Sequence, residues 1–563
     1  MRIRKLLRVR FVVDPFTEQE KIMAELTPMM QKYMETKEQY KDCILFYRLG
    51  DFYEMFFDDA LVASKELEIT LTGKSCGLEE RAPMCGIPYH AVEGYLSKLV
   101  SRGYKVAICE QVEDPKLAKG LVKREVIRVV TPGTNLNVQS LEAGKNNYLL
   151  SIAYTPDGIG ISAADVTTGD YYVTEVEDLK KLNDELMKYE PSEIICNEAF
   201  LVSGFDVNDL KSRLHISVNA LESHMFDDDG CRRILMKHFK VNTLIGLGVE
   251  EFPTGLLAAG ALLQYLYDTQ KTDLEHFTHI YPYLTSKYML LDSSTRRNLE
   301  LTETLREKQK RGSLLWVLDK TKTAMGARLL HNYIEQPLIE KDEMEKRLDA
   351  IQELNQDSIS RDEIREYLNP IYDLERLLSK VTYKTANPRD LIAFRNSLQM
   401  LPPIKTVLSA FEKEELTEIR EQIDGLEDIY QLIDEAIIDE PPLSIREGGM
   451  IKDQFDETID RLRSAKHDGK QWLAQLEEED RERTGIKNLK IKYNKVFGYY
   501  FEVTNSYKDL VPEDYIRKQT LANAERYTTP RLKELEDTIL GAEDKLYALE
   551  YELYCTVRDT IAG

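Results

Sequence analysis

The stretch Leu532-Lys-Glu-Leu-Glu-Asp-Thr-Ile-Leu-Gly-Ala-Glu-Asp-Lys-Leu-Tyr-Ala-Leu-Glu-Tyr-Glu-Leu553 carries a sustained heptad pattern. Its apolar residues are spaced alternately three and four positions apart, in the order Leu532, Leu535, Ile539, Ala542, Leu546, Leu549 and Leu553. This spacing predicts a long helix with one apolar seam, and such a seam requires a partner helix.

The partner is expected upstream, where apolar residues also recur at helical spacing. They are Ile451, Phe455, Ile459, Leu462, Ala465, Trp472 and Leu476. At 1.5 Å per residue, a helix of roughly 30 residues reaches about 45 Å, which is longer than a packed domain helix needs to be. We therefore predict an arm made of two antiparallel helices.

Residues 486–501, between the two helices, read Ile-Lys-Asn-Leu-Lys-Ile-Lys-Tyr-Asn-Lys-Val-Phe-Gly-Tyr-Tyr-Phe. The β-branched and aromatic residues predict strands at the tip of the arm. Lys490 and Lys492 alternate with Leu489, Ile491 and Tyr493, so on a strand both ammonium groups face one side while the apolar residues pack inward. This basic face could bind phosphates, but lysines that protect an edge strand from aggregation explain it equally well.

The first part of the chain mixes helix and strand signals. Thr27-Pro28 is typical of a helix start, because threonine can cap a helix and proline suits its first position, and this helix should end near Tyr40. Residues 43–48 predict a buried strand, Gly50-Asp51 a turn, and residues 52–57 a returning aromatic segment.

Two further regions follow the candidate domain boundary at Val130-Thr-Pro-Gly133. Residues 148–240 predict a small α/β domain that begins with a hairpin, and residues from Gly255 to Gly448 predict mostly helix. The expected fold class is multidomain, α/β followed by mainly α.

The composition indicates an ordered globular protein of about four domains. The 563 residues are 42% hydrophobic and 31% charged, with a formal net charge of -23. No apolar run is long enough to span a membrane, and the seven scattered cysteines show no C-x-x-C spacing, so we expect a reducing, cytoplasmic setting. Residues 1–22 carry a basic start that resembles a short targeting segment, but arginines interrupt its apolar stretch, and a non-native extension is the simpler interpretation.

Enzyme signatures are weak. Gly73-Lys-Ser75 lacks the upstream glycine of a phosphate-binding loop, and Gly158-Ile-Gly-Ile-Ser-Ala163 lies in a predicted hairpin rather than at a helix start. His276 and His279 have no well-placed cysteine or acid nearby. Asp165 lies where a ribonuclease-H-like nuclease would hold a metal, but no companion carboxylates can be identified. We expect no catalytic and no metal-binding residues.

Two other features point to nucleic acid. Residues 116–128 hold five basic residues and one acidic residue, a net +4 that could equally be a solvated face. In Gly50-Asp-Phe-Tyr-Glu-Met-Phe-Phe57, Phe52 could follow a tight turn outward and wedge between base steps, with Glu54 on the same side of a strand as a hydrogen-bond acceptor. A core aromatic cluster is the alternative.

The aromatic stretch resembles the mismatch-reading motif of the MutS family of DNA mismatch-repair proteins. Six further motifs match that family in order: Pro83-Met-Cys-Gly-Ile-Pro-Tyr-His-Ala91, Val106-Ala-Ile-Cys-Glu-Gln111, Arg128-Val-Val-Thr-Pro-Gly-Thr134, Thr321-Lys-Thr-Ala-Met-Gly-Ala-Arg-Leu-Leu330, Phe497-Gly-Tyr-Tyr500 and Asn523-Ala-Glu-Arg-Tyr527. The resemblance extends from about Met23 to the end of the chain.

The resemblance implies a domain plan. It comprises an extension at 1–22, a mismatch-binding domain at 23–137, a ribonuclease-H-like connector at 138–280, a helical core and lever at 281–447 and 522–563, and the lever tip with a small β-containing clamp at 448–521. The family's ATPase domain lies outside the sequence, so we expect no ATP or Mg²⁺ bound here and no enzymatic activity. The implied partners are mismatched double-stranded DNA, a second copy in the full-length family and a MutL-type repair protein.

The resemblance also implies site residues. Phe52 would stack on a mispaired base, Glu54 would hydrogen-bond it, and Met84 would approach the groove beside them. Arg124 would contact backbone phosphate. The residues of the clamp expected at phosphates are Lys490, Lys492, Asn494 and Lys495. A protein-binding scaffold and a connector nuclease remain the rival interpretations.

Overall fold

The computed structural model describes residues 25–563 except 114–119, 138–140, 213, 215, 443–444, 446–447, 495 and the side chains of 465–467. Two compact units are present. The first runs to Arg361 and includes Leu378–Tyr383 and Lys413–Glu415; the second comprises Asp362–Leu377, Lys384–Glu412 and Leu416–Gly563. In the part of the chain that is described, no helix is long and apolar enough to cross a membrane.

The first unit begins with a six-stranded mixed sheet in the order β3-β4-β2-β1-β5-β6. Its strands are β1 (Cys43–Leu49), β2 (Phe52–Phe56), β3 (Thr72–Lys74), β4 (Ala82–Pro88), β5 (Lys105–Gln111) and β6 (Arg124–Val130). Only β1 and β5 pair in parallel. The predicted strand, turn and returning segment are thus confirmed as β1, Gly50-Asp51 and β2.

Helices cover both faces of this sheet. On one face, α3 (Pro28–Gln39) packs with Leu45, Tyr47 and Phe56. On the other face, α4 (Phe57–Leu67) and α5 (Val92–Val100) pack with Ile44, Phe46 and Met55. The predicted helix start is confirmed, with Pro28 in the first turn. Thr27 stands at the N-cap but its side chain makes no capping hydrogen bond, so the predicted capping role is wrong.

A second six-stranded sheet follows, in the order β11-β10-β7-β8-β9-β12. Its strands are β7 (Leu149–Thr155), β8 (Gly158–Asp165), β9 (Asp170–Val176), β10 (Glu193–Cys196), β11 (Ser217–Ala220) and β12 (Tyr281–Pro282). β7, β8 and β9 form the predicted antiparallel hairpins, while β10 joins β7, and β11 joins β10, in parallel.

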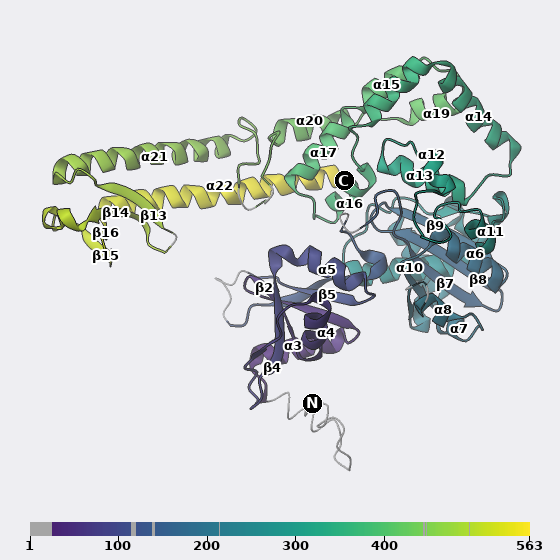
Figure 1. Ribbon diagram of the computed structural model, residues 1–563, viewed down its shortest axis with the longest axis horizontal. Helices are drawn as coiled ribbons and strands as arrows, with labels where there is room; N and C mark the ends of the chain where they lie inside the picture. The colour runs from purple at the N-terminus through teal and green to yellow at the C-terminus, as the bar shows by residue number, and fades with distance from the viewer. Residues whose placement is uncertain are drawn as a thin grey trace, which may run out of the picture. The chain divides into compact units, whose positions relative to one another are not determined.

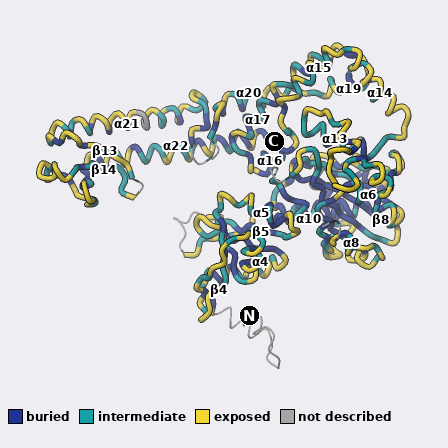
Figure 2. Tube along the Cα trace, in the orientation of Figure 1, coloured by how far each residue is buried: buried dark blue, intermediate teal, exposed yellow. Residues whose placement is uncertain are grey.

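The second sheet is also covered on both faces. Helices α9 (Asp228–His238) and α10 (Pro253–Gln270) pack on one face, and α6 (Leu179–Tyr189), α7 (Glu198–Leu201) and α8 (Val207–Ser212) on the other. Figure 2 shows buried residues concentrated along β5, β8 and α10. The candidate boundary at Pro132-Gly133 lies in the 3-10 helix η2 (Pro132–Thr134), and the Gly133 amide donates to Glu193 on β10 (3.1 Å).

The rest of the chain up to residue 436 is mainly helical. Its helices are α11 (Ser293–Asn298), α12 (Leu314–Leu318), α13 (Ala324–Glu335), α14 (Lys341–Gln356), α15 (Ser358–Leu368), α16 (Leu374–Thr382), α17 (Pro388–Leu398), α18 (Leu401–Leu408), α19 (Glu414–Gln422) and α20 (Glu427–Ala436). The prediction of mostly helix from Gly255 onward is wrong for residues 271–313, where α11 is the one α-helix. There the Leu305 amide donates to the Glu300 carboxylate (2.7 Å) and the Ser313 hydroxyl donates to the Lys310 carbonyl (2.7 Å). Such side-chain bonds offer the backbone an alternative to a helix.

The second unit contains the predicted arm. Helices α21 (Glu457–Thr484) and α22 (Pro530–Ala562) run side by side in Figure 1, and Leu532, Ile539 and Leu546 of the heptad seam are buried. The first helix begins at Glu457 rather than near Ile451, because Asp456 caps it through the Thr458 and Ile459 amides.

The far end of the arm carries a four-stranded antiparallel sheet in the order β13-β14-β16-β15. Its strands are β13 (Lys490–Asn494), β14 (Gly498–Thr504), β15 (Ile516–Thr520) and β16 (Ala524–Thr528). The prediction of strands at the tip is therefore confirmed. We call this sheet with its connecting loops the tip, residues 486–528.

Candidate nucleic-acid interface

The turn between β1 and β2 presents Phe52 at the surface. Gly50 adopts a φ of +59°, a conformation that side chains other than glycine rarely adopt, and the chain reverses within two residues. Phe52 is the first residue of β2 and is 47% exposed, whereas Tyr53, Met55 and Phe56 are buried. The alternative interpretation of this stretch is a core aromatic cluster. It holds for Tyr53 and Phe56, but Phe52 lies outside the core.

A polar network lies behind this turn. The Arg48 guanidinium bonds Glu110 Oε1 (3.0 Å) and the Gly50 carbonyl (2.5 Å), and it lies over the Tyr89 ring at 3.8 Å from the centroid. Tyr53 donates its hydroxyl to the same Glu110 oxygen. Burial, followed by this carboxylate, raises the pKa of Tyr53. The turn that precedes Phe52 is therefore held in one conformation.

Glu54 lies on the same face of β2 as Phe52, as the alternation of the strand predicts. Its Oε2 accepts a hydrogen bond from Lys74 Nζ on β3 (2.6 Å). On the neighbouring strand β4, the residue paired with Glu54 is Gly86, which has no side chain to cover the carboxylate. An aromatic ring and a paired carboxylate thus stand together on an open part of the sheet.

Met84 lies at the other end of this face. It pairs with Phe56, whereas Phe52 pairs with Pro88, so three residue pairs separate Met84 from Phe52 along the strands. Met84 is partly buried and packs against the core beneath α3. The structure thus brings Phe52 and Glu54 together and leaves Met84 at the edge of the core.

Arg124 joins the same face from β6. Its Nε donates to the Arg48 carbonyl (2.8 Å), its Nη1 donates to the Val122 carbonyl (2.8 Å), and its guanidinium lies 5.3 Å from the centroid of the Tyr47 ring. Tyr47 pairs with Glu54 across β1 and β2. The backbone therefore fixes a positive charge that comes from β6, three strands away from Glu54 on β2.

The second basic stretch, residues 116–128, offers less positive charge than its composition indicates. Lys116 and Lys119 lie outside the described residues. Lys123 pairs with Glu125 (2.6 Å), and the Nε of Arg128 is buried. Of the described basic residues in this stretch, only Arg124 stands on the face that carries Phe52.

The two described lysines of β13 differ in their ion pairing. Lys490 is exposed, and among the described residues it has no ion-pair partner. Lys492 Nζ pairs with Glu502 Oε1 on β14 (2.7 Å), which raises the pKa of Lys492. Asn494 Oδ1 accepts a hydrogen bond from the Val496 amide (2.8 Å) in the β13–β14 turn, and Lys495 lies outside the described residues.

Most of the apolar residues of β13 pack inward as predicted. Leu489 is fully buried and Ile491 packs against the tip core. Tyr493 is 50% exposed and lies 5.0 Å from Tyr499, ring centroid to ring centroid, so its predicted inward position is wrong. The tip therefore exposes an aromatic ring beside its lysines.

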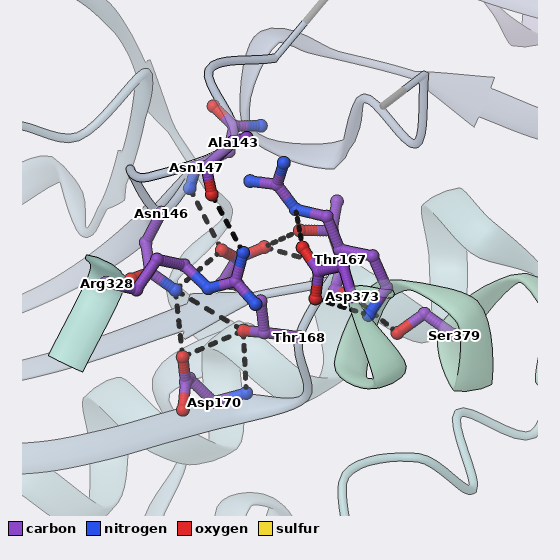
Figure 3. A network of polar contacts seen from close by, with 11 residues as sticks. Ala143, Asn146, Asn147, Thr167, Thr168, Asp170, Arg328, Asp373 and Ser379 are labelled. Atoms are coloured by element: carbon purple, nitrogen blue, oxygen red, sulfur yellow. Dashed lines mark hydrogen bonds and ion pairs between the residues drawn. The ribbon is translucent and has the colours of Figure 1, made fainter. Parts of the chain in front are cut away.

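The Asp165 carboxylate has the contacts of a structural residue, and Figure 3 labels three of its partners, Asn146, Asn147 and Thr167. It is buried and accepts hydrogen bonds from Asn146 Nδ2 (2.9 Å), the Asn147 amide (3.0 Å), the Thr167 amide (2.8 Å) and the Thr167 hydroxyl (2.7 Å). These bonds hold the β8–β9 turn. The charge is satisfied without a metal ion.

The other candidate sites from the sequence are the two histidines and the glycine-rich stretch that begins at Gly158. His276 is buried, and this burial lowers its pKa to about 3, while His279 is exposed beside Tyr281. Within the described ranges, no group of three or more His, Cys, Asp and Glu side chains could hold a metal ion. Gly158 opens β8 after the hairpin turn, as expected for a strand rather than a dinucleotide site.

Sequence reasoning did not identify Arg48, Lys74, Tyr89 or Glu110 as part of this interface. Lys74 was considered only as part of a phosphate-binding loop. The pairing of Lys74 with Glu54 across β4, and of Arg48 with Glu110 across β1 and β5, depends on strand order, which no local pattern encodes.

Comparisons with known proteins agree with these observations. Three family models match in succession: MutS domain I over residues 27–139, MutS domain II over 147–278 and MutS domain III over 294–563. Proteins called DNA mismatch repair protein MutS are 67% identical in Lachnoclostridium phytofermentans, 54% in Ruminiclostridium cellulolyticum and 53% in Acetivibrio thermocellus, each over 96% of this chain. The chain spans 58% of the first relative and 62% of the other two. Because consecutive MutS domain models and these relatives cover nearly all of its length, this chain belongs to the MutS family.

Proposed function

We propose that this chain recognises mispaired or small-loop duplex DNA in mismatch repair. The observation that carries the proposal is the exposed ring of Phe52 on a fixed turn, with Glu54 beside it on the same open face. A well-paired duplex resists unstacking, which costs a few kcal/mol per base step, whereas a mispaired step is already weakly stacked. A rigid aromatic wedge therefore favours mismatched DNA.

The named residues would divide the work. Phe52 stacks on the mispaired base, Glu54 accepts a hydrogen bond from it, and Met84 lines the groove at the far end of the face. Arg124 contacts a backbone phosphate. The residues of the tip that grip phosphates without regard to sequence are Lys490, Lys492, Asn494 and Lys495. Phosphate contacts position the duplex, and the wedge supplies discrimination.

The finer domain plan is part of this proposal. Residues 23–137 form the mismatch-binding domain and 138–280 a connector of ribonuclease-H-like topology, which is supported by its order of three antiparallel strands followed by two parallel strands, β9-β8-β7-β10-β11. Residues 281–447 and 522–563 form the helical core and lever, and 448–521 the lever tip with the clamp.

We assign no enzymatic activity and no cofactor to these residues. ATP and Mg²⁺, and movement along DNA as a sliding clamp, would belong to the ATPase domain that family resemblance implies for the full-length protein. Dimerisation, a MutL-type partner and a cytoplasmic, nucleoid-associated location are likewise proposed from that resemblance. A protein-only scaffold, the rival proposal, would bind no duplex in a salt-dependent manner.

Fluorescence anisotropy with a G·T duplex and its matched counterpart, at two salt concentrations, tests the proposal. Stacking of a base on an aromatic ring is worth about 1–3 kcal/mol, so Phe52→Ala should weaken binding to the G·T duplex about tenfold and leave the matched duplex nearly unchanged. Leu61→Ala is the matched control, because Leu61 is also 47% exposed but lies on α4, which covers the opposite face. An equal loss on both duplexes with Phe52→Ala would contradict the wedge.

A further inference from the structure

The ion pair between Glu54 and Lys74 spans three strands. Glu54 lies on β2 and Lys74 on β3, with β4 between them in the sheet. The Lys74 Nζ lies 2.6 Å from Glu54 Oε2 and 5.5 Å from the centroid of the Phe56 ring. The side chain of Lys74 therefore extends along the face that carries Phe52 and ends at the carboxylate.

The intervening strand leaves room for this contact. Gly86 pairs with Glu54, and a Cβ on Gly86 would stand 3.3 Å from the Tyr53 carbonyl and 3.6 Å from Glu54 Cγ. An added Cβ would therefore press on the Tyr53 carbonyl oxygen and come into contact with the Glu54 side chain. The Glu54 and Lys74 side chains are 17% and 35% exposed, so the pair is partly shielded from water before any ligand arrives.

The two carboxylate oxygens of Glu54 are therefore not equivalent. Oε2 is engaged by Lys74, and within the described part of the chain Oε1 has no hydrogen-bond partner. An ionised carboxylate only accepts hydrogen bonds, so Oε1 can receive an N–H group of a base. Fixing one oxygen limits the rotamers of Glu54 and so lowers the entropy lost when the other oxygen binds.

We propose that Lys74 is a positioning residue for mismatch recognition, which holds Glu54 through Oε2 and directs Oε1 toward the mispaired base. This inference rests on the proposed function. DNA that covers the face removes water from the ion pair and strengthens it, because the attraction of opposite charges rises as the local dielectric constant falls. Without Lys74, Glu54 would stand as an unneutralised charge near phosphates, free to rotate away from the base.

A direct phosphate contact is the alternative role for Lys74. A lysine that only neutralises a phosphate weakens binding to every duplex by the same factor and does not depend on Glu54. A positioning lysine instead changes the ratio of the matched to the mismatched dissociation constant, and it does so only while Glu54 is present. The ratio therefore separates the two roles.

The test is a double-mutant cycle on this ratio, with Lys74→Met, Glu54→Ala and the double variant. We expect Lys74→Met to lower the preference for the G·T duplex about three- to tenfold, and we expect no further loss when it is added to Glu54→Ala, because contacting residues are non-additive. Lys74→Arg should restore most of the preference. Lys65→Met, at an exposed lysine on α4, controls for the loss of one positive charge.

Additive effects in the cycle, an unchanged ratio or a raised ratio with Lys74→Met would each overturn the positioning role. These results differ from a failure of the proposed function, in which the unaltered chain shows no preference for the G·T duplex or Phe52→Ala leaves its preference intact. A Lys74→Met variant that fails to fold would show an altered circular dichroism spectrum, and Lys74→Gln would then replace it in the cycle.

Discussion

The guanidinium of Arg48 lies 3.8 Å from the centroid of the Tyr89 ring, on the side of the turn that leads into Phe52. Together these two residues contact Gly50, Asp51 and Glu110. Arg48 bonds the Gly50 carbonyl and Glu110, and the Tyr89 amide donates to the Asp51 carbonyl (3.0 Å). Both residues of the turn are thus held from the sheet side, so Phe52 cannot retreat without breaking several bonds.

Replacing Arg48 should lower both the preference for mismatched DNA and the stability of the fold. Arg48→Ala removes charge-assisted hydrogen bonds and leaves Glu110 with a single side-chain partner, Tyr53, which should lower the free energy of unfolding by about 1–3 kcal/mol. The preference for a G·T duplex should fall more than the affinity for matched DNA. Urea unfolding and anisotropy measure the two effects.

Arg48→Lys provides the control for charge. Lysine keeps the positive charge but cannot form the planar fork that bonds Gly50 and Glu110 while lying on Tyr89. We therefore expect Arg48→Lys to resemble Arg48→Ala in mismatch preference. Full retention of the preference by the lysine variant would show that charge alone matters at this position.

The sequence alone predicted the features that depend on the residues of a single strand or helix. Alternation along a strand placed Phe52 and Glu54 on one face, and heptad spacing placed Leu532, Ile539 and Leu546 in a buried seam. These relationships depend only on the period of one element. The structure confirms them, and no contact between different elements is needed to explain them.

Long-range contacts could not be predicted in this way. The partners of Glu54 and Lys492 are residues on other strands, and their pairing follows from sheet order and register. Residues 271–313 are predicted as helix because few turn residues interrupt them, but side-chain bonds to the backbone and packing against the second sheet determine their path. Tertiary structure overrides local propensity in such segments.

The ion pair between Lys492 and Glu502 leads to a prediction about the tip. Glu502 neutralises Lys492, which contacts a phosphate in the proposed function. Glu502→Gln should therefore strengthen binding to matched and mismatched duplexes alike, by about two- to fivefold, the range expected for a partly exposed pair.

Lys490→Ala should weaken binding to both matched and mismatched duplexes and reduce the slope of log K against log salt by about one.

Glu513→Gln is the control for net charge, because Glu513 is an exposed carboxylate of the same tip and makes no ion pair with another described residue. Salt titrations by anisotropy distinguish the variants. If Glu513→Gln strengthens binding as much as Glu502→Gln, the effect is one of overall charge, and the pairing of Lys492 has no specific role.

The arm depends on a close approach of its two helices. Gly469 on α21 faces Ile539 on α22, and a Cβ on Gly469 would stand 2.6 Å from Ile539 Cγ1. Gly469 is buried and Ile539 is 3% exposed, so neither residue has free space to move into. A methyl group at this point must push the helices apart or distort the isoleucine.

Two glycine-to-alanine substitutions separate packing from helix propensity. Gly541→Ala on α22 adds a methyl that meets no atom within 4 Å beyond its chain neighbours and its own turn of helix backbone. It should stabilise the arm by about 0.5–1 kcal/mol through the higher helix propensity of alanine. Gly469→Ala gains the same propensity but overpacks the helix contact, which typically costs about 1–3 kcal/mol, so it should destabilise the arm. Urea unfolding followed by helical circular dichroism compares the two. An equal rise in stability for both variants would mean that the helices separate at little cost, and the tip would then be held less firmly on its arm than the buried seam implies.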